Sequence, residues 1–209
     1  MTESGPIPAH PRTIRPFLLD THEVTVGEVI QKCRILPNAL RGRPELPPND
    51  FPVVSLLFDE AVMLAEQLGK RLPTEFEYEF AATNGGQTRY PWGPTRPPAD
   101  AWKLQPAGQP IFDRTATNPP MFGLFSNVVE FVDSRYAPYP KNQAAGVLAP
   151  DVPGSFAVLR GGGNVGESET EIVEQGPRRR SGHFRPLLAT NAGLRCARSK
   201  SPRLKAEDF

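Results

Sequence analysis

The sequence predicts an α+β fold in which two or three short helices precede short strands and long irregular loops. Apolar residues recur at helical spacing in three segments, all of them before residue 84. Beyond that point the apolar runs are short and are separated by Gly and Pro, and neither alternating βα units nor a glycine-rich dinucleotide motif is present. The 25 Pro and 18 Gly among 209 residues stay below the roughly 25–30% typical of disordered chains, so ordered loops are expected.

The N-terminal region combines an extended lead-in with a first helix. Residues 1–16 carry four prolines and are expected to lead, partly without order, into the strand-like segment Phe17–Leu19. Thr25 is an N-cap candidate for a short helix that begins at Val26 and ends at about Cys33. Residues 37–52 hold five prolines and one Gly, which predicts a long surface loop.

Two further helices are predicted before the chain becomes irregular. A 3.6-residue apolar period begins after Ser55, an N-cap candidate, and ends at Leu68 before a glycine. The run Thr74–Glu77 has the pattern of a capping box, and the helix that it starts is expected to end at about Thr83. Short strands are predicted in the apolar runs that follow, which are Met121–Phe125, Asn127–Val132 and Phe156–Leu159.

Composition and charge exclude several classes of protein. The 24 Lys and Arg residues nearly balance the 23 Asp and Glu residues, so nucleic acid is not an expected partner. The first twenty residues lack a secretory apolar core and no stretch reaches about 18 apolar residues, so a cytoplasmic protein without membrane contact is expected. Two cysteines and three scattered histidines give neither a disulfide framework nor a zinc motif.

Eight short segments appear in an order that resembles the formylglycine-generating enzyme, or sulfatase-modifying factor, family. The resemblance implies a C-type-lectin-like fold over residues 17–198, with a small twisted antiparallel sheet and long ordered loops, followed by a flexible tail at 199–209. The segments are Leu18–Thr25, Gly69–Thr74, Glu75–Ala82, Tyr90–Gly93, Phe122–Phe125, Asn127–Phe131, Leu159–Gly162 and Gly193–Ala197.

Several residues in these segments are expected to determine the fold. A buried arginine must be paired, and small residues suit close packing, so structural roles are more plausible for this set than ligand contacts. Trp92 is open to both interpretations, as a core side chain and as a candidate ligand contact. The expected structural residues are Arg71, Glu77, Arg160, Gly161, Gly162, Gly193, Arg195 and Cys196.

The resemblance also implies that the catalytic chemistry of the family is missing. Active members place two cysteines five positions apart after an Arg-Gly-Gly-Ser stretch, where the thiolates bind Cu(I). This chain has Arg-Gly-Gly-Gly at 160–163, and residues 164–190 contain no cysteine. Copper and catalysis are therefore not expected. The alternative is a divergent metal-dependent oxidoreductase that recruits its metal through His183 and nearby carboxylates.

Structural calcium is a second feature that the resemblance raises. The family holds calcium partly through a loop resembling Asn-x-x-Gly-Asn-Val-Trp-Glu, and here the corresponding segment 123–130 is shorter. Only the Val128 carbonyl and Glu130 are left as donors, whereas calcium needs about six to eight oxygens. Asp100 could belong to a second family site. No cofactor is expected, and a remnant calcium site stays open as the alternative.

An abrupt change of charge occupies the region where the active site of the family would lie. Four glutamates at 167, 169, 171 and 174 precede a basic run, and the two groups could pair internally at about 0–1 kcal/mol per exposed pair. Alternatively, they could form a surface that binds a protein or peptide ligand, including an acidic one. The candidate ligand-binding residues are Trp92, Glu167, Glu169, Arg178, Arg179, Arg180, His183, Phe184, Arg185 and Asn191.

The expected function is a non-catalytic recognition module. Similar folds act as variable ligand-recognition proteins encoded by diversity-generating retroelements and as domains attached to bacterial signalling kinases, so a role in bacterial signalling, defence or variable recognition is expected. The sequence has no kinase Gly-rich loop, HRD or DFG motif. A kinase or effector partner would therefore lie elsewhere on the same polypeptide or on another one. A purely scaffolding role is a third possibility.

Overall fold

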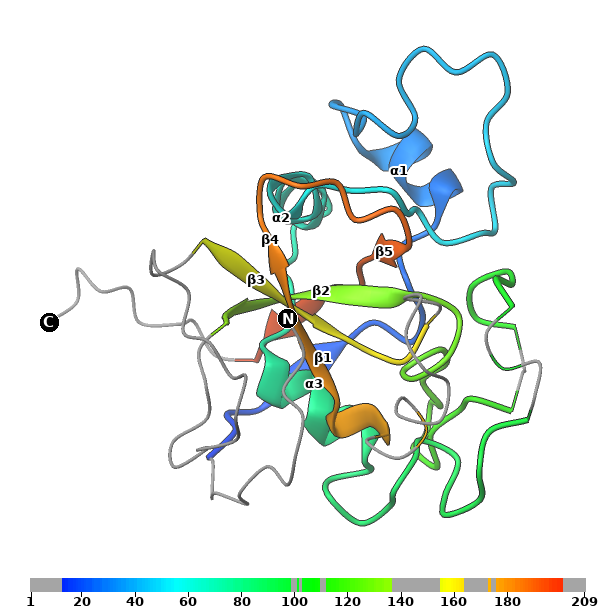
Figure 1. The fold of residues 1–209 in the computed structure, drawn as a ribbon, viewed down its shortest axis with the longest axis vertical. Helices are drawn as coiled ribbons and strands as arrows, with labels where there is room; N and C mark the ends of the chain where they lie inside the picture. The colour runs from blue at the N-terminus through cyan, green and yellow to red at the C-terminus, as the bar shows by residue number, and fades with distance from the viewer. Residues whose placement is uncertain are drawn as a thin grey trace, which may run out of the picture.

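The computed structural model describes residues 13–98, 101, 103–109, 112–136, 155–163, 173 and 176–200, and Figure 1 shows their arrangement. The helices of the described chain are α1, α2, α3 and a short 3-10 helix, η1. Their bounds are α1 Val26–Lys32, α2 Phe58–Gln67, α3 Glu75–Ala82 and η1 Gly176–Arg178. The strands are β1 Phe17–Leu19, β2 Val129–Arg135, β3 Phe156–Arg160, β4 Arg180–Phe184, β5 Ala192–Gly193 and β6 Ala197–Ser199.

The strands form two sheets. In the larger sheet the order is β4-β3-β2-β5, with antiparallel pairs except for the parallel β2 and β5. In the smaller sheet β1 pairs antiparallel with β6, which places Phe17 opposite Ser199. The last strand of the fold therefore reaches one residue beyond the predicted boundary at 198.

Helices cover both faces of the larger sheet, and the alternation of side chains along β2 explains why. Val129 and Phe131 point to the face where they pack with residues of α2. Val132 belongs to the opposite face, in a cluster with Tyr78 and Ala82 of α3. Figure 1 shows α2 and α3 on opposite sides of this sheet. The predicted α+β fold class is confirmed, with one parallel strand pair in the sheet.

Two of the three helix starts agree with their predicted caps. Thr25 and Thr74 each form a capping box in which the threonine oxygen accepts from the amide three residues later. The prediction of Ser55 as the cap of α2 is wrong. Ser55 has φ +61 and its hydroxyl donates to the Thr190 carbonyl, while the Glu60 carboxylate accepts from the Leu57 amide at the start of the helix.

The predicted strand at Met121–Phe125 is not formed. In this run only Phe122 makes an isolated bridge, to Arg114, and the segment is otherwise a series of bends. The predicted surface loop at 37–52 is irregular, as expected. Among the described residues, no helix is both long enough and apolar enough to cross a membrane.

Candidate functional site

A buried ion pair joins two of the segments that carry the family resemblance, Asn127–Phe131 and Gly193–Ala197. Arg195 and Glu130 are both fully buried, and the guanidinium donates to both carboxylate oxygens, with Nη2 to Oε1 at 2.7 Å and Nε to Oε2 at 2.8 Å. Arg195 also donates to the carbonyls of Phe122 and Gly123 at 2.8 and 3.1 Å. Burial raises the pKa of Glu130, and the positive charge of Arg195 acts in the opposite direction.

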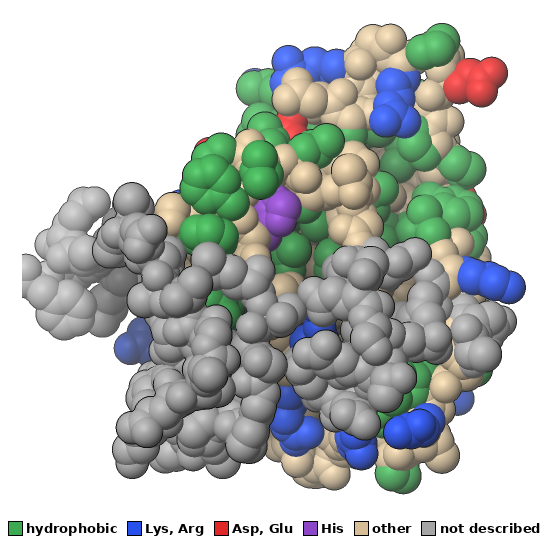
Figure 2. Space-filling model, in the orientation of Figure 1, with side chains coloured by type: hydrophobic (Ala, Val, Ile, Leu, Met, Phe, Trp, Pro, Cys, Tyr) green, Lys and Arg blue, Asp and Glu red, His purple; other side chains and the backbone are tan. Residues whose placement is uncertain are grey.

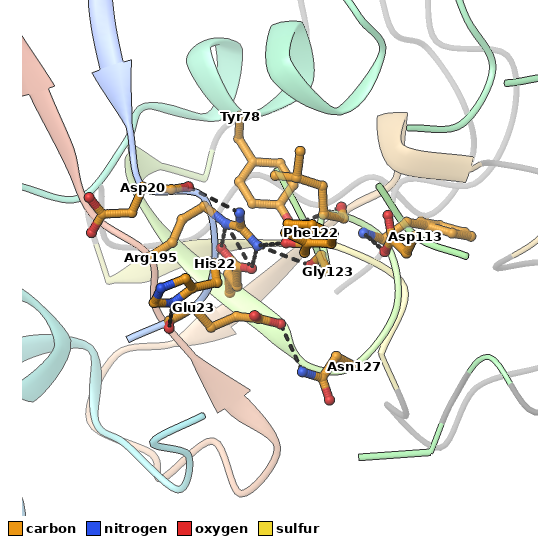
Figure 3. Close-up of polar contacts among 12 residues, drawn as sticks. Asp20, His22, Glu23, Tyr78, Asp113, Phe122, Gly123, Asn127 and Arg195 are labelled. Carbon is orange, nitrogen blue, oxygen red and sulfur yellow. Dashed lines mark hydrogen bonds and ion pairs between the residues drawn. The ribbon is translucent and has the colours of Figure 1, made fainter. Parts of the chain in front are cut away.

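Other buried side chains hold the rest of the segment Phe122–Asn127, as Figure 3 shows. Asp113 Oδ2 accepts from the amides of Phe125 and Ser126 at 2.8 and 2.7 Å and from the Ser126 hydroxyl. The Tyr78 hydroxyl donates to the Leu124 carbonyl at 2.9 Å. Because side chains take these backbone groups, the apolar run 121–125 does not form a strand.

The residues named for calcium give a mixed result. Glu130 uses both carboxylate oxygens to accept from Arg195, so its principal partner is a guanidinium and not an open cation site. Across the described residues, no group of three or more acidic, His or Cys side chains gathers where it could hold a metal ion. Asp100 lies outside the described residues. In the described part of the chain, Glu130 therefore does not offer a free carboxylate beside the Val128 carbonyl.

The position of the serine in the family's Arg-Gly-Gly-Ser stretch is closed by backbone in this chain. Gly163 ends the Arg-Gly-Gly-Gly stretch, and a Cβ built on it would lie 2.7 Å from the carbonyl carbon of Val128 and 2.8 Å from the Val129 amide nitrogen. The neighbouring Gly162 amide donates to the Phe125 carbonyl at 2.7 Å, which fixes this approach. A serine side chain has no room at Gly163 without movement of the main chain.

The two cysteines belong to the hydrophobic core. Cys196 is fully buried, and burial raises its pKa to about 12. Cys33 packs against the same core cluster, and burial raises its pKa as well. Thiolates are the copper ligands and the nucleophiles of cysteine chemistry, and both residues are held as thiols. The residues present therefore do not fit the thiolate copper site of catalytic family members.

The expectation that Arg179 and Arg180 form an exposed basic surface is corrected by the structure. Each is only 1% exposed. Arg180 lies opposite Arg160 in the register of β3 and β4, and its Nε is 3.1 Å from the Glu75 carboxylate on α3. The register of β3 and β4 thus places Arg180 beneath α3. The local charge pattern of the sequence does not indicate this placement.

Arg160 joins the same buried cluster. Its Nη2 donates to Glu79 at 3.0 Å and to Glu75 at 3.3 Å, and its Nη1 donates to the Arg178 carbonyl at 2.8 Å. The carboxylates of these described ion pairs come from α3. The residues Glu167, Glu169, Glu171 and Glu174, which the sequence offered as partners, lie outside the described residues.

The exposed part of the basic region lies at the two ends of β4. Arg178 is exposed just before the strand, and Phe184 is exposed at its end, with its ring 5.4 Å from that of Phe156. Arg185 places its guanidinium 4.0 Å from the Phe58 ring centroid and 3.6 Å from Asp59. The sequence-predicted residues are therefore divided between these two ends and the interior.

The turn after β4 carries apolar side chains that the sequence analysis missed. Leu187 is 57% exposed and Leu188 is 50% exposed, next to the exposed Phe184. His183 Nε2 lies 2.9 Å from the Leu187 carbonyl, which ties the turn to the strand. Figure 2 shows hydrophobic side chains gathered beside a histidine on the face where β4 ends near α2. We call Phe184, Leu187 and Leu188 the turn patch.

The remaining predicted residues contribute to packing. Trp92 is half-buried and stacks on Tyr90, with ring centroids 5.0 Å apart. Arg71 donates to both oxygens of Glu77 at 2.7 Å and so ties β6 to α3 through its further contact with Ser199. Asn191 is half-buried beside β5. Gly161 has φ +92, which suits glycine, and a Cβ on Gly193 would lie 2.8 Å from the Val53 carbonyl oxygen.

A family comparison agrees with this architecture. The family model of the sulfatase-modifying factor enzyme 1-like domain matches residues 1–200. The chain belongs to this family. A formylglycine-generating enzyme from Thermomonospora curvata is 45% identical over 65 residues, which cover 28% of this chain and 22% of that protein.

Longer matches connect the domain to other proteins. The serine/threonine-protein kinase Pkn1 of Chlamydia trachomatis is 28% identical over 182 residues, which cover 75% of this chain and 29% of the kinase. The chain thus spans less than a third of the length of either relative. The solved Treponema denticola variable protein 1 superposes with a TM-score of 0.58 at 19% identity, covering 88% of this chain and 84% of that one, and it shows the shared fold.

Proposed function

We propose that this chain is a non-catalytic recognition module that binds a protein or peptide ligand through the turn patch and the adjacent Arg185. The observation that supports the non-catalytic part is the close approach of backbone at Gly163, where an added Cβ would lie 2.7 Å from the Val128 carbonyl carbon and 2.8 Å from the Val129 nitrogen. This contact leaves no space for the serine of catalytic members, and the chain also lacks their cysteine pair.

The exposed chemistry of the turn patch supports recognition of an apolar anchor. An aromatic ring and two leucines next to each other can bury the side chains of a ligand, and aromatic and arginine residues dominate interface energetics. Arg185 adds a planar donor at the edge of the patch, and Arg178 adds an exposed one at the other end of β4. The ligand that fits best is a peptide with an apolar side chain flanked by a carboxylate.

The relatives make a signalling or variable-recognition setting plausible. Pkn1 is described as a kinase that contains a matching region, and the Treponema protein is described as variable. By analogy, we infer that this domain acts as the sensing or target-binding part of a bacterial system, with any kinase or effector carried elsewhere.

The proposal is tested by selecting a displayed random peptide library on the full chain and measuring the enriched peptides by titration calorimetry. Leu187→Glu with Leu188→Glu is expected to weaken binding at least about tenfold, because charges replace the buried anchor contact. The matched control is Leu46→Glu, another exposed leucine, which is expected to bind like the wild type. Thermal midpoints of all three proteins are expected to agree closely, since exposed substitutions change stability by about 0.5 kcal/mol at most.

Two outcomes would contradict this proposal. One is that no peptide is enriched on the wild type over a denatured sample. The other is that the control variant loses binding as much as the turn variant, which would place the contact elsewhere. Arg178→Glu gives an independent readout, because it is expected to weaken the binding of acidic peptides and to reduce the salt dependence of that binding.

A further inference from the structure

Glu23 occupies an unusual position in the interior. It lies between β1 and α1, it is fully buried, and its Oε1 accepts from the Asn127 side-chain amide at 2.9 Å. Its other oxygen, Oε2, is buried and has no hydrogen-bond partner in the part of the chain that the structure describes. A Cβ on Gly123 would overlap Oε1, so the carboxyl group is packed directly against the segment Phe122–Asn127.

The charges around Glu23 do not neutralise it. Arg195, which precedes β6, attracts the carboxylate, but it directs its hydrogen bonds to Glu130 and to backbone carbonyls. Glu130 on β2 repels it. Asp113 is a third buried carboxyl group and accepts from amides of the same segment, while its Oδ1 has no hydrogen-bond partner among the described residues. Three buried carboxyl groups therefore share one guanidinium.

Two other titratable groups complete the surroundings. The hydroxyl of Tyr78 on α3 is engaged by the Leu124 carbonyl, and burial raises the pKa of this phenol further. The ring of His22, next to Glu23 in sequence, is directed by Nδ1 to the Glu23 backbone carbonyl at 2.8 Å. Neither group donates to the Glu23 carboxylate in this geometry. An unpaired buried carboxylate costs several kcal/mol, and such a group takes up a proton instead.

We propose that Glu23 is a neutral carboxylic acid in the folded protein and that its ionisation loosens the segment Phe122–Asn127, so that the fold contains a pH-sensitive latch. Burial raises the pKa of Glu23 to about 8, with Glu130 adding to the shift and Arg195 opposing it. At neutral pH Glu23 is protonated and the segment Phe122–Asn127 is held in place. Under mildly alkaline conditions Glu23 ionises and the segment loosens.

The latch is connected to the neighbouring loops by hydrogen bonds. The Asn127 amide group donates to Glu23 and its oxygen accepts from the Gln105 backbone amide at 2.8 Å. One residue of the same segment, Phe125, accepts from the Gly162 amide at 2.7 Å. Ionisation of Glu23 is therefore expected to disturb the backbone both in residues 103–109 and at Gly161–Gly163.

The sign of the pH dependence follows from linkage. The folded pKa of Glu23 lies above its unfolded value, so between about pH 5 and pH 8 the folded state binds one more proton than the unfolded state. The stability that this proton provides is complete at low pH and is lost as the pH rises. The unfolding equilibrium constant is expected to grow up to about tenfold per pH unit in this window and to level off above it.

The experiment compares the wild type with Glu23→Gln by urea unfolding from pH 5 to pH 9, at constant ionic strength with EDTA. Glutamine imitates the neutral acid and has no proton to lose. The unfolding equilibrium constant of the variant is therefore expected to lack the increase of up to about tenfold per pH unit that Glu23 contributes in the wild type. Asp113 and Glu130 contribute to both proteins and cancel in the difference. Parallel curves for the two proteins would overturn the proposal. Glu77→Gln is the control. It removes a different buried carboxylate, whose pKa burial alone would raise but whose bonds to Arg71 lower it below the ordinary value, so its stability should keep the wild-type slope with pH.

Two further measurements test the proposal even if the Glu23→Gln variant does not fold. Infrared spectra of the wild type at pH 7 should show a buried protonated carboxyl band that disappears by about pH 9, and its absence at pH 7 would overturn the proposal. The unfolding series is repeated with calcium in place of EDTA. A calcium-dependent stabilisation that abolishes the pH slope would show that a cation, and not a proton, neutralises Glu23, and it would equally overturn the latch.

Discussion

Arg195→Met is expected to lower the free energy of unfolding by about 3–5 kcal/mol, because it leaves the Glu130 carboxylate buried without its partner. Both members of this pair are fully buried, so no water replaces the lost hydrogen bonds. The same change removes the donors that hold the carbonyls of Phe122 and Gly123. Urea unfolding monitored by tryptophan fluorescence measures the effect.

Lys32→Met is the matched control for this prediction. The pair of Lys32 and Glu28 is an exposed i,i+4 contact at 3.1 Å, and its loss should cost well under about 1 kcal/mol. The double variant Arg195→Met with Glu130→Met removes both buried charges and is expected to recover part of the loss. If Arg195→Met lowered the free energy of unfolding as little as Lys32→Met, the buried pair of Arg195 and Glu130 would not be a main source of stability in the fold.

Gly163→Ser is expected to destabilise the protein by about 1–3 kcal/mol through overpacking. The added Cβ meets the main chain of Val128 and Val129, which cannot move aside as a flexible side chain can. Ala116→Ser adds the same hydroxyl at an exposed position and should stay within about 0.5 kcal/mol of the wild type. A Gly163→Ser protein as stable as the wild type would show that the serine site of catalytic members is open here, against the proposed function.

The local parts of the fold could be predicted from the sequence. Thr25 and Thr74 cap helices through contacts within three residues, so the pattern alone contains the information. Ser55 has the same residue type, but its hydroxyl serves the Thr190 carbonyl, which is 135 positions away. The run 121–125 fails as a strand for a similar reason, because Tyr78 and Asp113 come from other parts of the chain.

The candidate site was less predictable than the fold. A run of arginines has the composition of a solvated surface, yet the register of β4 places Arg180 beneath α3 against Glu75. The turn patch had a signal in the adjacent leucines Leu187 and Leu188 after Pro186, which an exposed turn does not need for its own folding. Glu23 had none, since burial of a single glutamate depends on tertiary packing.

The central proposal, that this family member does not carry out copper thiolate chemistry, is tested most directly by Cu(I) binding. The reduced full chain is titrated under anaerobic conditions against a chromophoric Cu(I) chelator, with a catalytic formylglycine-generating enzyme as positive control. Because Cys196 is buried as a thiol and the half-buried Cys33 packs against the same core, copper is expected to remain with the chelator. Transfer of an equimolar amount of copper to the chain would contradict the account and identify the protein as a metal-dependent member of its family.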